Sequence, residues 1–321
     1  MNARILVGDC RETLKSLPDG SVQCCVTSPP YYGLRDYGHD GQLGLEPTPD
    51  EYVANLVGVF REVRRVLRDD GTVFLNLGDS YAAGKTGRDD GHRRNSWGVF
   101  ADGEAKPEHM AGTGKNRPAP PGLKPKDLIG IPWRVAFALQ ADGWWLRSDI
   151  VWSKPNPMPE SVTDRPTKSH EYVFLLSKSQ TYYYDADAIA EPGVIPAGTY
   201  AAVKGKATRA RTMGLREPSG NEREGVGWTY TGTRNARTVW TITTQPYKES
   251  HFAVFPEELA RRCIVAGCPK GGTVLDPFGG SGTVGAVAFG NGRDAVLCEL
   301  NPEYTDMARR RIGPMFVTVD P

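Results

Sequence analysis

No apolar run in this chain is long enough to cross a membrane, since such a span needs about 18 consecutive apolar residues. The opening MNARILVGDC also lacks the apolar centre of a secretory signal. These two absences predict a cytoplasmic protein. The 321 residues are 39% hydrophobic and 24% charged, which suffices for one large core with insertions or for two domains.

Cysteine is scarce, with six residues, no CxxC pair and no histidines at metal-ligand spacing. Cys24, Cys25 and Cys298 lie in apolar runs, while Cys263 and Cys268 lie in a helical pattern. We therefore expect reduced, packed thiols, and neither a disulfide framework nor a metal site.

A strong excess of either charge is also missing, because the formal net charge is +1. The average hides two basic stretches. Residues 84–126 hold nine Lys/Arg against five Asp/Glu, and residues 201–240 hold eight against three. Local basic surface is what attracts a phosphate backbone. Charge alone leaves open whether these stretches bind nucleic acid or are solvated loops.

Regular patterns predict alternating strands and helices. Apolar residues recur at helical spacing across 50–67, and other helices are indicated at 10–20, 127–143, 256–267, 283–290 and 302–312. Strands are indicated at 3–9, 21–28, 71–80, 144–154, 171–179, 272–278 and 294–300, with a weaker one at 237–244. This alternation predicts an α/β fold, a doubly wound and mostly parallel sheet with helices on both faces.

The segment VLDPFGGSGTVGAVAFGNGRDAVLCEL has the pattern of a cofactor loop. Gly280, Gly282 and Gly285 follow a strand and open a helix, and Glu299 ends the next strand, where a carboxylate can accept from ribose hydroxyls. The glycines alone fit either NAD or S-adenosylmethionine. Asp276 favours S-adenosylmethionine, because a carboxylate beside a pyrophosphate would be repelled.

The segment TSPPYY ends an apolar strand in a way that neither strand nor helix could continue. The Ser28 hydroxyl and the Pro29 carbonyl, held by φ-locked prolines, can accept hydrogen bonds from an exocyclic amine and direct its lone pair toward a methyl donor. Tyr31 can stack on a base swung out of a duplex. These residues, with Pro30, form a predicted base clamp, although alone they would also serve to terminate a strand.

Together, TSPPY at 27–31 and DPFGGSGT at 276–283 resemble the catalytic and cofactor motifs of the DNA amino-methyltransferases of the beta class, in which catalysis precedes cofactor binding. Further segments similar to this family occur in the expected order at 8–10, 71–81, 152–179 and 251–259. The resemblance covers nearly all of the chain outside the two irregular stretches. It implies a Rossmann-like fold with circularly permuted motif order.

The resemblance also implies roles for individual residues. The catalytic set would be Ser28, Pro29, Pro30 and Tyr31. The set that binds S-adenosyl-L-methionine would be Asp276, Phe278, Gly279, Gly280 and Gly282 at the methionine end, Glu299 at the ribose, Asp9 at the adenine amino group, and His251 and Phe252 closing over the cofactor. No metal is implied.

The resemblance implies a target as well. No cysteine follows a proline, as carbon-5 methylation in such families would require, so direct transfer to nitrogen remains. Serine at position 28, where adenine enzymes of this family usually have aspartate, favours cytosine N4 over adenine N6. The alternatives are a protein-amide methyltransferase, an inactive DNA-binding module and a dehydrogenase, and the last leaves TSPPY unexplained.

We expect the catalytic domain to be interrupted twice. Its parts are 1–83, 127–184 and 247–321, separated by the insertion 84–126 and by 185–246, the family's usual target-recognition slot. In that slot the candidate DNA-binding residues are Arg209, Arg211, Arg216, Arg234 and Arg237. The expected partner is double-stranded DNA, with or without a cognate restriction endonuclease, and the protein is expected as a monomer or homodimer. Lys154, Asn156, Asp164, Arg165 and Glu171 are either catalytic or part of a hydrogen-bonded loop.

Overall fold

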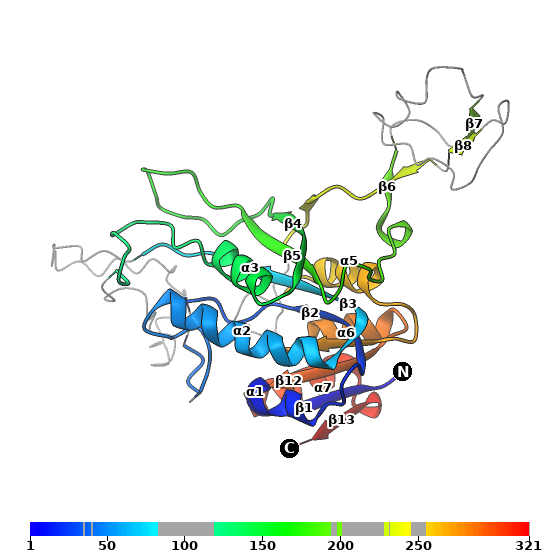
Figure 1. Ribbon diagram of the computed structural model, residues 1–321, viewed down its shortest axis with the longest axis horizontal. Coiled ribbons are helices and arrows are strands. Elements are labelled where there is room, and N and C mark those ends of the chain that lie inside the picture. The colour runs from blue at the N-terminus through cyan, green and yellow to red at the C-terminus, as the bar shows by residue number, and fades with distance from the viewer. Residues whose placement is uncertain are drawn as a thin grey trace, which may run out of the picture.

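The computed structural model of the chain describes residues 1–34, 36–39, 41–82, 119–193, 198–200, 228–230, 232–244 and 255–320. Its centre is a sheet covered by helices on both faces (Figure 1). Nine strands form this sheet in the order β10-β4-β5-β3-β2-β11-β12-β1-β13. They are β1 (Ala3–Val7), β2 (Val22–Thr27), β3 (Leu67–Leu77), β4 (Trp145–Ser153), β5 (His170–Ser177), β10 (Val239–Thr241), β11 (Thr273–Asp276), β12 (Asp294–Glu299) and β13 (Val317–Asp320).

The sheet is parallel except around β5, which runs antiparallel to both β3 and β4. β2 and β11 are neighbours in the sheet, with Cys24 opposite Val274, although most of the chain lies between them. The predicted doubly wound, mostly parallel sheet is confirmed. As a consequence, the carboxyl ends of the parallel strands and the amino end of β5 meet at one edge.

Helix α2 (Pro49–Val66) shows how the local sequence builds these elements. The Thr48 side chain accepts from the Glu51 N–H at 3.2 Å, which caps the helix, and Pro49 supplies a fixed φ in its first turn. Its apolar face, which includes Leu56 and Phe60, is fully buried against the sheet. The predicted helix 50–67 is therefore confirmed to within one residue.

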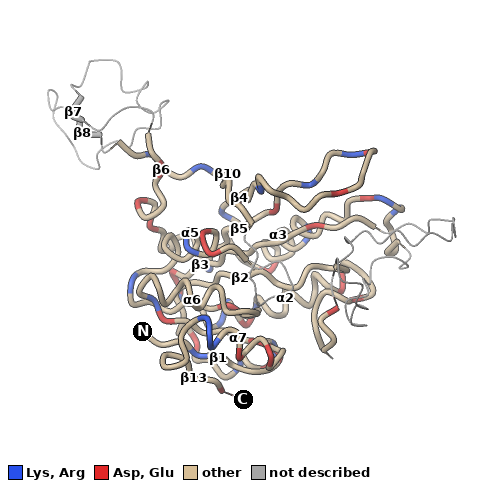
Figure 2. Tube along the Cα trace, turned by 180° about the vertical axis from the view of Figure 1, so that it is seen from behind, with Lys and Arg blue, Asp and Glu red and all other residues tan. Residues whose placement is uncertain are grey.

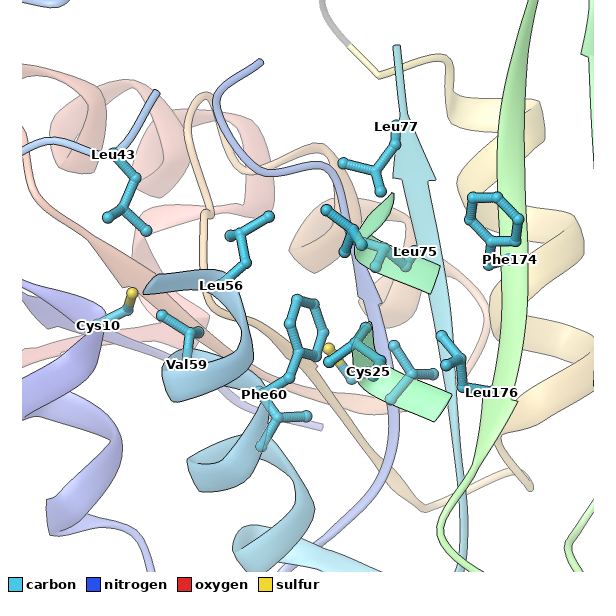
Figure 3. Close-up of a cluster of buried hydrophobic side chains, with 14 of the residues drawn as sticks. Cys10, Cys25, Leu43, Leu56, Val59, Phe60, Leu75, Leu77, Phe174 and Leu176 are labelled. Carbon is cyan, nitrogen blue, oxygen red and sulfur yellow. The ribbon is translucent and has the colours of Figure 1, made fainter. Parts of the chain in front are cut away.

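Two apolar clusters lie on opposite faces of the sheet. One joins α1 (Cys10–Thr13), α2 and α3 (Ile131–Ala141) to residues of the central strands, among them Cys25, Leu75 and Phe174 (Figure 3). The other joins α5 (Glu257–Gly267), α6 (Thr283–Gly290) and α7 (Pro302–Ile312) to the opposite side. All six cysteines are buried and free, as the packing of their apolar segments predicted.

The structure differs from the sequence prediction at several short elements. The helix expected over 10–20 is only α1 followed by the 3-10 turn η1 (Leu14–Ser16), since Pro18 disfavours helical backbone at the residue before it. Strand β10 covers only the middle of the expected strand 237–244. Strand β13, which follows the 3-10 turn η4 (Pro314–Phe316), was not predicted, because its alternating segment VTVD is only four residues long.

The region after β5 leaves the sheet. It contains the 3-10 turn η3 (Asp187–Ile189) and two small antiparallel pairs, β6 (Glu191–Pro192) with β9 (Thr233–Arg234) and β7 (Gly198–Tyr200) with β8 (Trp228–Tyr230). Both views place β6 away from the central strands (Figure 1, Figure 2). Most of the predicted insertion 84–126 lies outside the described residues. Among the helices that are described, none combines the length and the apolar character that crossing a membrane would need.

Candidate active site

The predicted clamp residues and the described candidates for cofactor binding lie at the sheet edge where β1, β2, β11 and β12 end. Thr27 closes β2 and Asp276 closes β11, and the Thr27 hydroxyl donates to Asp276 Oδ1 at 2.6 Å. Ser28, which begins the clamp, follows Thr27 directly. The structure therefore brings the two predicted motifs together, because one hydrogen bond joins the residues from which they start.

The loop after β11 is held open by its glycines. Gly282 has φ +77°, and a Cβ there would lie 2.6 Å from the Ala308 Cβ, so this position requires glycine. At Gly280, by contrast, a Cβ would meet only the Phe278 carbonyl at 3.9 Å among the described residues, so the loop's backbone is open to a ligand. The Gly280 N–H donates to Glu299 Oε2 at 2.6 Å.

Arg311 fixes this loop from the side. Its guanidinium is 10% exposed and donates to Ser281 Oγ at 3.1 Å and Thr283 Oγ1 at 2.7 Å. It also pairs with Glu257 at the start of α5, at 2.8 Å. The loop that opens α6 is thus tied to two other helices and has a preset shape.

Two carboxylates, buried Asp276 and half-buried Glu299, stand beside the loop. Asp276 is 4% exposed and accepts from Thr27 and from the Phe278 N–H at 3.0 Å, yet burial raises its pKa to about 7. Burial also raises the pKa of Glu299, although Glu299 accepts from the Asn301 and Gly280 N–H groups. Within the described ranges neither acid is paired with a lysine or arginine, so a cationic ligand would be stabilised here.

Asp9 lies just past β1 at the same edge and is the N-cap of α1, accepting from the Arg11 N–H at 2.9 Å. Burial alone would raise its pKa, but hydrogen bonds and charge from Arg11 outweigh burial and lower it. The Arg11 guanidinium also donates to the Gly41 carbonyl at 3.0 Å. Asp9 is therefore ionised and anchored, and its predicted contact with adenine stays a prediction.

The clamp, residues 28–31, is held from two sides. Below it, the hydroxyl of fully buried Tyr52 donates to the Pro30 carbonyl at 2.8 Å. On the other side, the Tyr31 hydroxyl donates to Glu171 Oε2 at 2.6 Å, and Asn76 Nδ2 donates to the Tyr31 oxygen at 2.7 Å. Burial and the neighbouring charge of Glu171 raise the pKa of Tyr31 well above its ordinary value, so its hydroxyl keeps its proton.

Sequence reasoning missed Asn76, Tyr52 and Gly78. Asn76 is 1% exposed near the end of β3, and no described residue donates to its Oδ1; a buried oxygen without a partner costs about 1 to 3 kcal/mol. An asparagine inside the apolar run VFLNL was the available signal, since a polar residue in a buried strand needs a reason to be there. Gly78 and Tyr52 gave no such signal, because their roles depend on contacts distant in sequence.

The predicted DNA-binding residues are only partly described. Arg234 and Arg237 both lie within ion-pair distance of Glu191, at 3.4 and 2.8 Å, in the region that leaves the sheet. His251, Phe252, Arg209, Arg211 and Arg216 lie outside the described residues.

The structure also describes the five residues from Lys154 to Glu171 for which the sequence left open a catalytic role or a place in a hydrogen-bonded loop. Lys154 and Glu171 form an ion pair beside the clamp. Asn156 accepts from the Thr244 N–H at 3.0 Å, which makes it part of a hydrogen-bonded loop. Arg165 lies over the Tyr81 ring, 3.9 Å from its centroid, and Asp164 pairs with Lys126 at 2.6 Å.

Comparison with known proteins shows which family the chain belongs to. Residues 22–310 match the model of the N6/N4 DNA methylase family, described as DNA methylase. Among curated relatives, the type II methyltransferase M.SmaI of Serratia marcescens is 48% identical over 97% of this chain and 91% of its own length. The type II methyltransferase M.Cfr9I of Citrobacter freundii is 47% identical over 97% of this chain and 87% of its own length.

Solved structures share the fold. The cytosine-N4-specific PvuII DNA methyltransferase aligns with a TM-score of 0.63 at 18% identity, over 98% of this chain and 87% of that one. The putative DNA modification methylase TTHA0409 of Thermus thermophilus, solved in complex with S-adenosyl-L-methionine, aligns with a TM-score of 0.56 at 22% identity, over 99% of this chain and 100% of that one. The chain belongs to the N4/N6 class of DNA amino-methyltransferases, as its TSPPY and DPFGGSGT motifs predicted.

The contact between Gly78 and Tyr31 gives a test of the clamp's geometry. A Cβ at Gly78 would lie 2.4 Å from Tyr31 Cε2, so Gly78→Ala must displace the Tyr31 ring. We expect Gly78→Ala to lower the methylation rate by about 100-fold, because a misplaced reacting group loses the productive geometry. Gly290→Ala is the matched control, since a Cβ there has no atom of the described residues within 4 Å. Steady-state rates on DNA for both variants check this, and equal rates would contradict the assigned clamp geometry.

Proposed function

We propose that this protein transfers a methyl group from S-adenosyl-L-methionine to the N4 amine of a cytosine flipped out of duplex DNA. The observation that carries the proposal is the Thr27–Asp276 hydrogen bond, 2.6 Å long, which places the clamp beside the glycine loop. A methyl donor held by the loop and an amine held by the clamp would then be neighbours. No covalent bond to the enzyme is needed, because proximity and orientation supply the catalysis.

The residues around the loop fit S-adenosyl-L-methionine. Asp276 and the backbone of Phe278, Gly279 and Gly280 would hold its methionine end, where a buried carboxylate without a cation partner in the described chain suits a positively charged group. When bound, the cofactor supplies an electrophilic methyl group. Gly282 shapes the loop that receives it.

The rest of the cofactor would lie toward β12 and β1. Glu299 would accept from the ribose hydroxyls, as a carboxylate at this strand end does in nucleotide-binding folds. Asp9 would accept from the adenine amino group, and His251 and Phe252 would close over the cofactor. Glu299 ends β12 and Asp9 lies two residues past β1, and these strands pair directly, with Val7 opposite Glu299.

The clamp residues would prepare the target amine. Its nitrogen is a poor nucleophile, because the lone pair is delocalised into the ring. The Ser28 hydroxyl and the Pro29 carbonyl would accept its two N–H hydrogen bonds and favour a pyramidal nitrogen. Tyr31 would stack on the extruded base, and its bonded hydroxyl fixes the ring in advance. Serine at position 28 favours cytosine over adenine as the target.

The protein would act in the cytoplasm on duplex DNA. Arg209, Arg211, Arg216, Arg234 and Arg237 are the candidate contacts to phosphates and base edges, in the target-recognition slot 185–246. Arg237 is the more accessible of the described pair, with 68% of its side chain exposed. The type II relatives favour a role beside a cognate restriction endonuclease.

The expected product is N4-methylcytosine. Purified protein is incubated with S-adenosyl-L-methionine and unmethylated genomic DNA, and the nucleosides obtained by digestion are identified by mass spectrometry. Reactions without the cofactor serve as the control. N6-methyladenine in place of N4-methylcytosine would contradict the assigned base but keep the clamp, whereas the absence of both would contradict the proposed function.

The raised pKa of Asp276 predicts a pH-dependent cofactor affinity. A bound cation favours the ionised carboxylate, so binding must release a proton wherever Asp276 is protonated in the free protein. Affinity should therefore rise with pH and flatten above the pKa of about 7. The folding stability of the free protein depends on pH in the opposite direction. The stability that protonated Asp276 contributes at low pH is lost as the pH rises through its folded-state pKa of about 7.

Calorimetric titrations in buffers of different ionisation enthalpy measure both the affinity and the released protons. Asp276→Asn should bind more weakly and with a flatter pH dependence. An affinity of the wild-type protein that does not change between about pH 6 and about pH 7.5 would show that Asp276 does not face the cofactor's charge.

A further inference from the structure

Glu171 ends a chain of hydrogen bonds that begins at Ser28. Glu171 lies at the start of β5, and its side chain is 14% exposed. Hydrogen bonds link this side chain to the clamp, although Glu171 and the clamp are far apart in sequence. Ser28 Oγ donates to the Tyr31 oxygen at 3.4 Å, and the Tyr31 hydroxyl donates to Glu171 Oε2 at 2.6 Å. The first bond is long, as hydrogen bonds in ligand-free active sites often are.

The other groups around Glu171 are donors. Lys154, just past β4, forms an ion pair with Oε1 and also lies over the Trp152 ring, 4.3 Å from its centroid. Asn76 Nδ2 donates to Glu171 Oε2 at 2.9 Å. An ionised carboxylate can only accept hydrogen bonds, so each of these neighbours is oriented by it.

The direction of the chain follows from counting donors and acceptors. Tyr31 has one hydroxyl proton, which it donates in the hydrogen bond to Glu171. Toward Asn76 and Ser28 the Tyr31 oxygen can therefore act only as an acceptor. Ser28 in turn gives its single proton to Tyr31. Asn76 Nδ2 also lies 3.3 Å from Ser28 Oγ, but an amide has two protons, and its shorter contacts with Tyr31 and Glu171 use both. A lone pair of Ser28 Oγ is therefore left to which no described residue donates.

Ser28 therefore meets its target as an acceptor. An exocyclic amine offers hydrogens to that lone pair, whereas a ring carbonyl oxygen offers lone pairs of its own and is repelled. We propose that Glu171 is a positioning residue that determines specificity, because its charge fixes the direction Ser28→Tyr31→Glu171 and so makes the clamp accept amino bases and reject keto bases. This inference rests on the proposed function, since it concerns the same clamp.

Glu171→Gln removes the charge of this side chain and keeps its size and shape. Lys154 would still require an oxygen facing it, so the new amide nitrogen of Glu171→Gln would face Tyr31 and Asn76. The unpartnered Asn76 Oδ1 could then accept from that nitrogen after rotation of the amide. The whole chain would reverse, Tyr31 would donate to Ser28, and Ser28 would donate outward. The Ser28 hydroxyl of the variant should then favour a carbonyl, while the Pro29 carbonyl still accepts from an amine.

The site that the wild-type protein methylates is first located by mapping its product on DNA. The test then uses two duplexes that contain this site. One has cytosine at the target position, and the other has uracil, which has a carbonyl oxygen in place of the amine. Dissociation constants are measured by fluorescence anisotropy with S-adenosylhomocysteine present, so that no transfer occurs. Each variant meets the same two duplexes, so differences in the ease of extruding the base cancel between variants. If the mapped base is adenine, the pair is adenine and hypoxanthine.

We expect the wild-type preference for the amino base to fall by about 10-fold or more in Glu171→Gln. Glu160→Gln is the matched control, because Glu160 is a loop carboxylate bonded to Arg165 at 2.7 Å, outside this chain of bonds. It should keep the wild-type preference. A full amino preference in Glu171→Gln would overturn the inference.

Tyr31→Phe guards against a folding defect, because it breaks the same chain at its middle and frees the Ser28 proton to point outward. It too should lose the preference, and a retained preference would overturn the inference independently. The proposed function fails separately: if wild-type protein methylates neither cytosine nor adenine, there is no site to map and both fall. If it methylates one of them and both variants keep its preference, only the inference fails.

Discussion

One hydrogen bond, from Thr27 to Asp276, joins the start of the predicted base clamp to the start of the predicted cofactor loop. The two residues are 249 positions apart, yet they end adjacent parallel strands. Side chains at the carboxyl ends of neighbouring parallel strands are forced together, which is why ligand sites of such sheets lie at that edge. The permuted order of the motifs does not disturb this, since the sheet and not the chain order sets which strand ends meet.

The same edge concentrates polar groups that the core would otherwise exclude. Asp276 and Asn76 are nearly fully buried, and Glu299 is half-buried. Burying a carboxylate without a cation destabilises the ionised form, and an unpartnered amide oxygen costs stability as well. Such costs are typical of sites that bind a ligand, where the missing partner is supplied by what binds. The apolar clusters on both faces of the sheet offset them.

The fold and the motifs were predictable because their signals are local. Each signal is visible within a short stretch of sequence: the apolar periodicity of α2, the glycines before α6 and the Pro-Pro turn after β2. The supports of the site did not, because Tyr52, Gly78 and Arg311 act on residues distant in sequence. Asn76 was visible only as a polar residue in an apolar strand, and Glu171 only as one charge among several. Strand β13 was not predicted, because four alternating residues are too few for a clear strand signal.

The proposed reaction requires above all that Ser28 accepts a hydrogen bond from the target amine. The most direct measurement compares turnover and cofactor affinity in Ser28→Ala. The variant removes only the hydroxyl, so methyl transfer to DNA should fall by about 100-fold or more, while the dissociation constant for S-adenosyl-L-methionine stays near the wild-type value. Wild-type turnover in this variant would contradict the central claim.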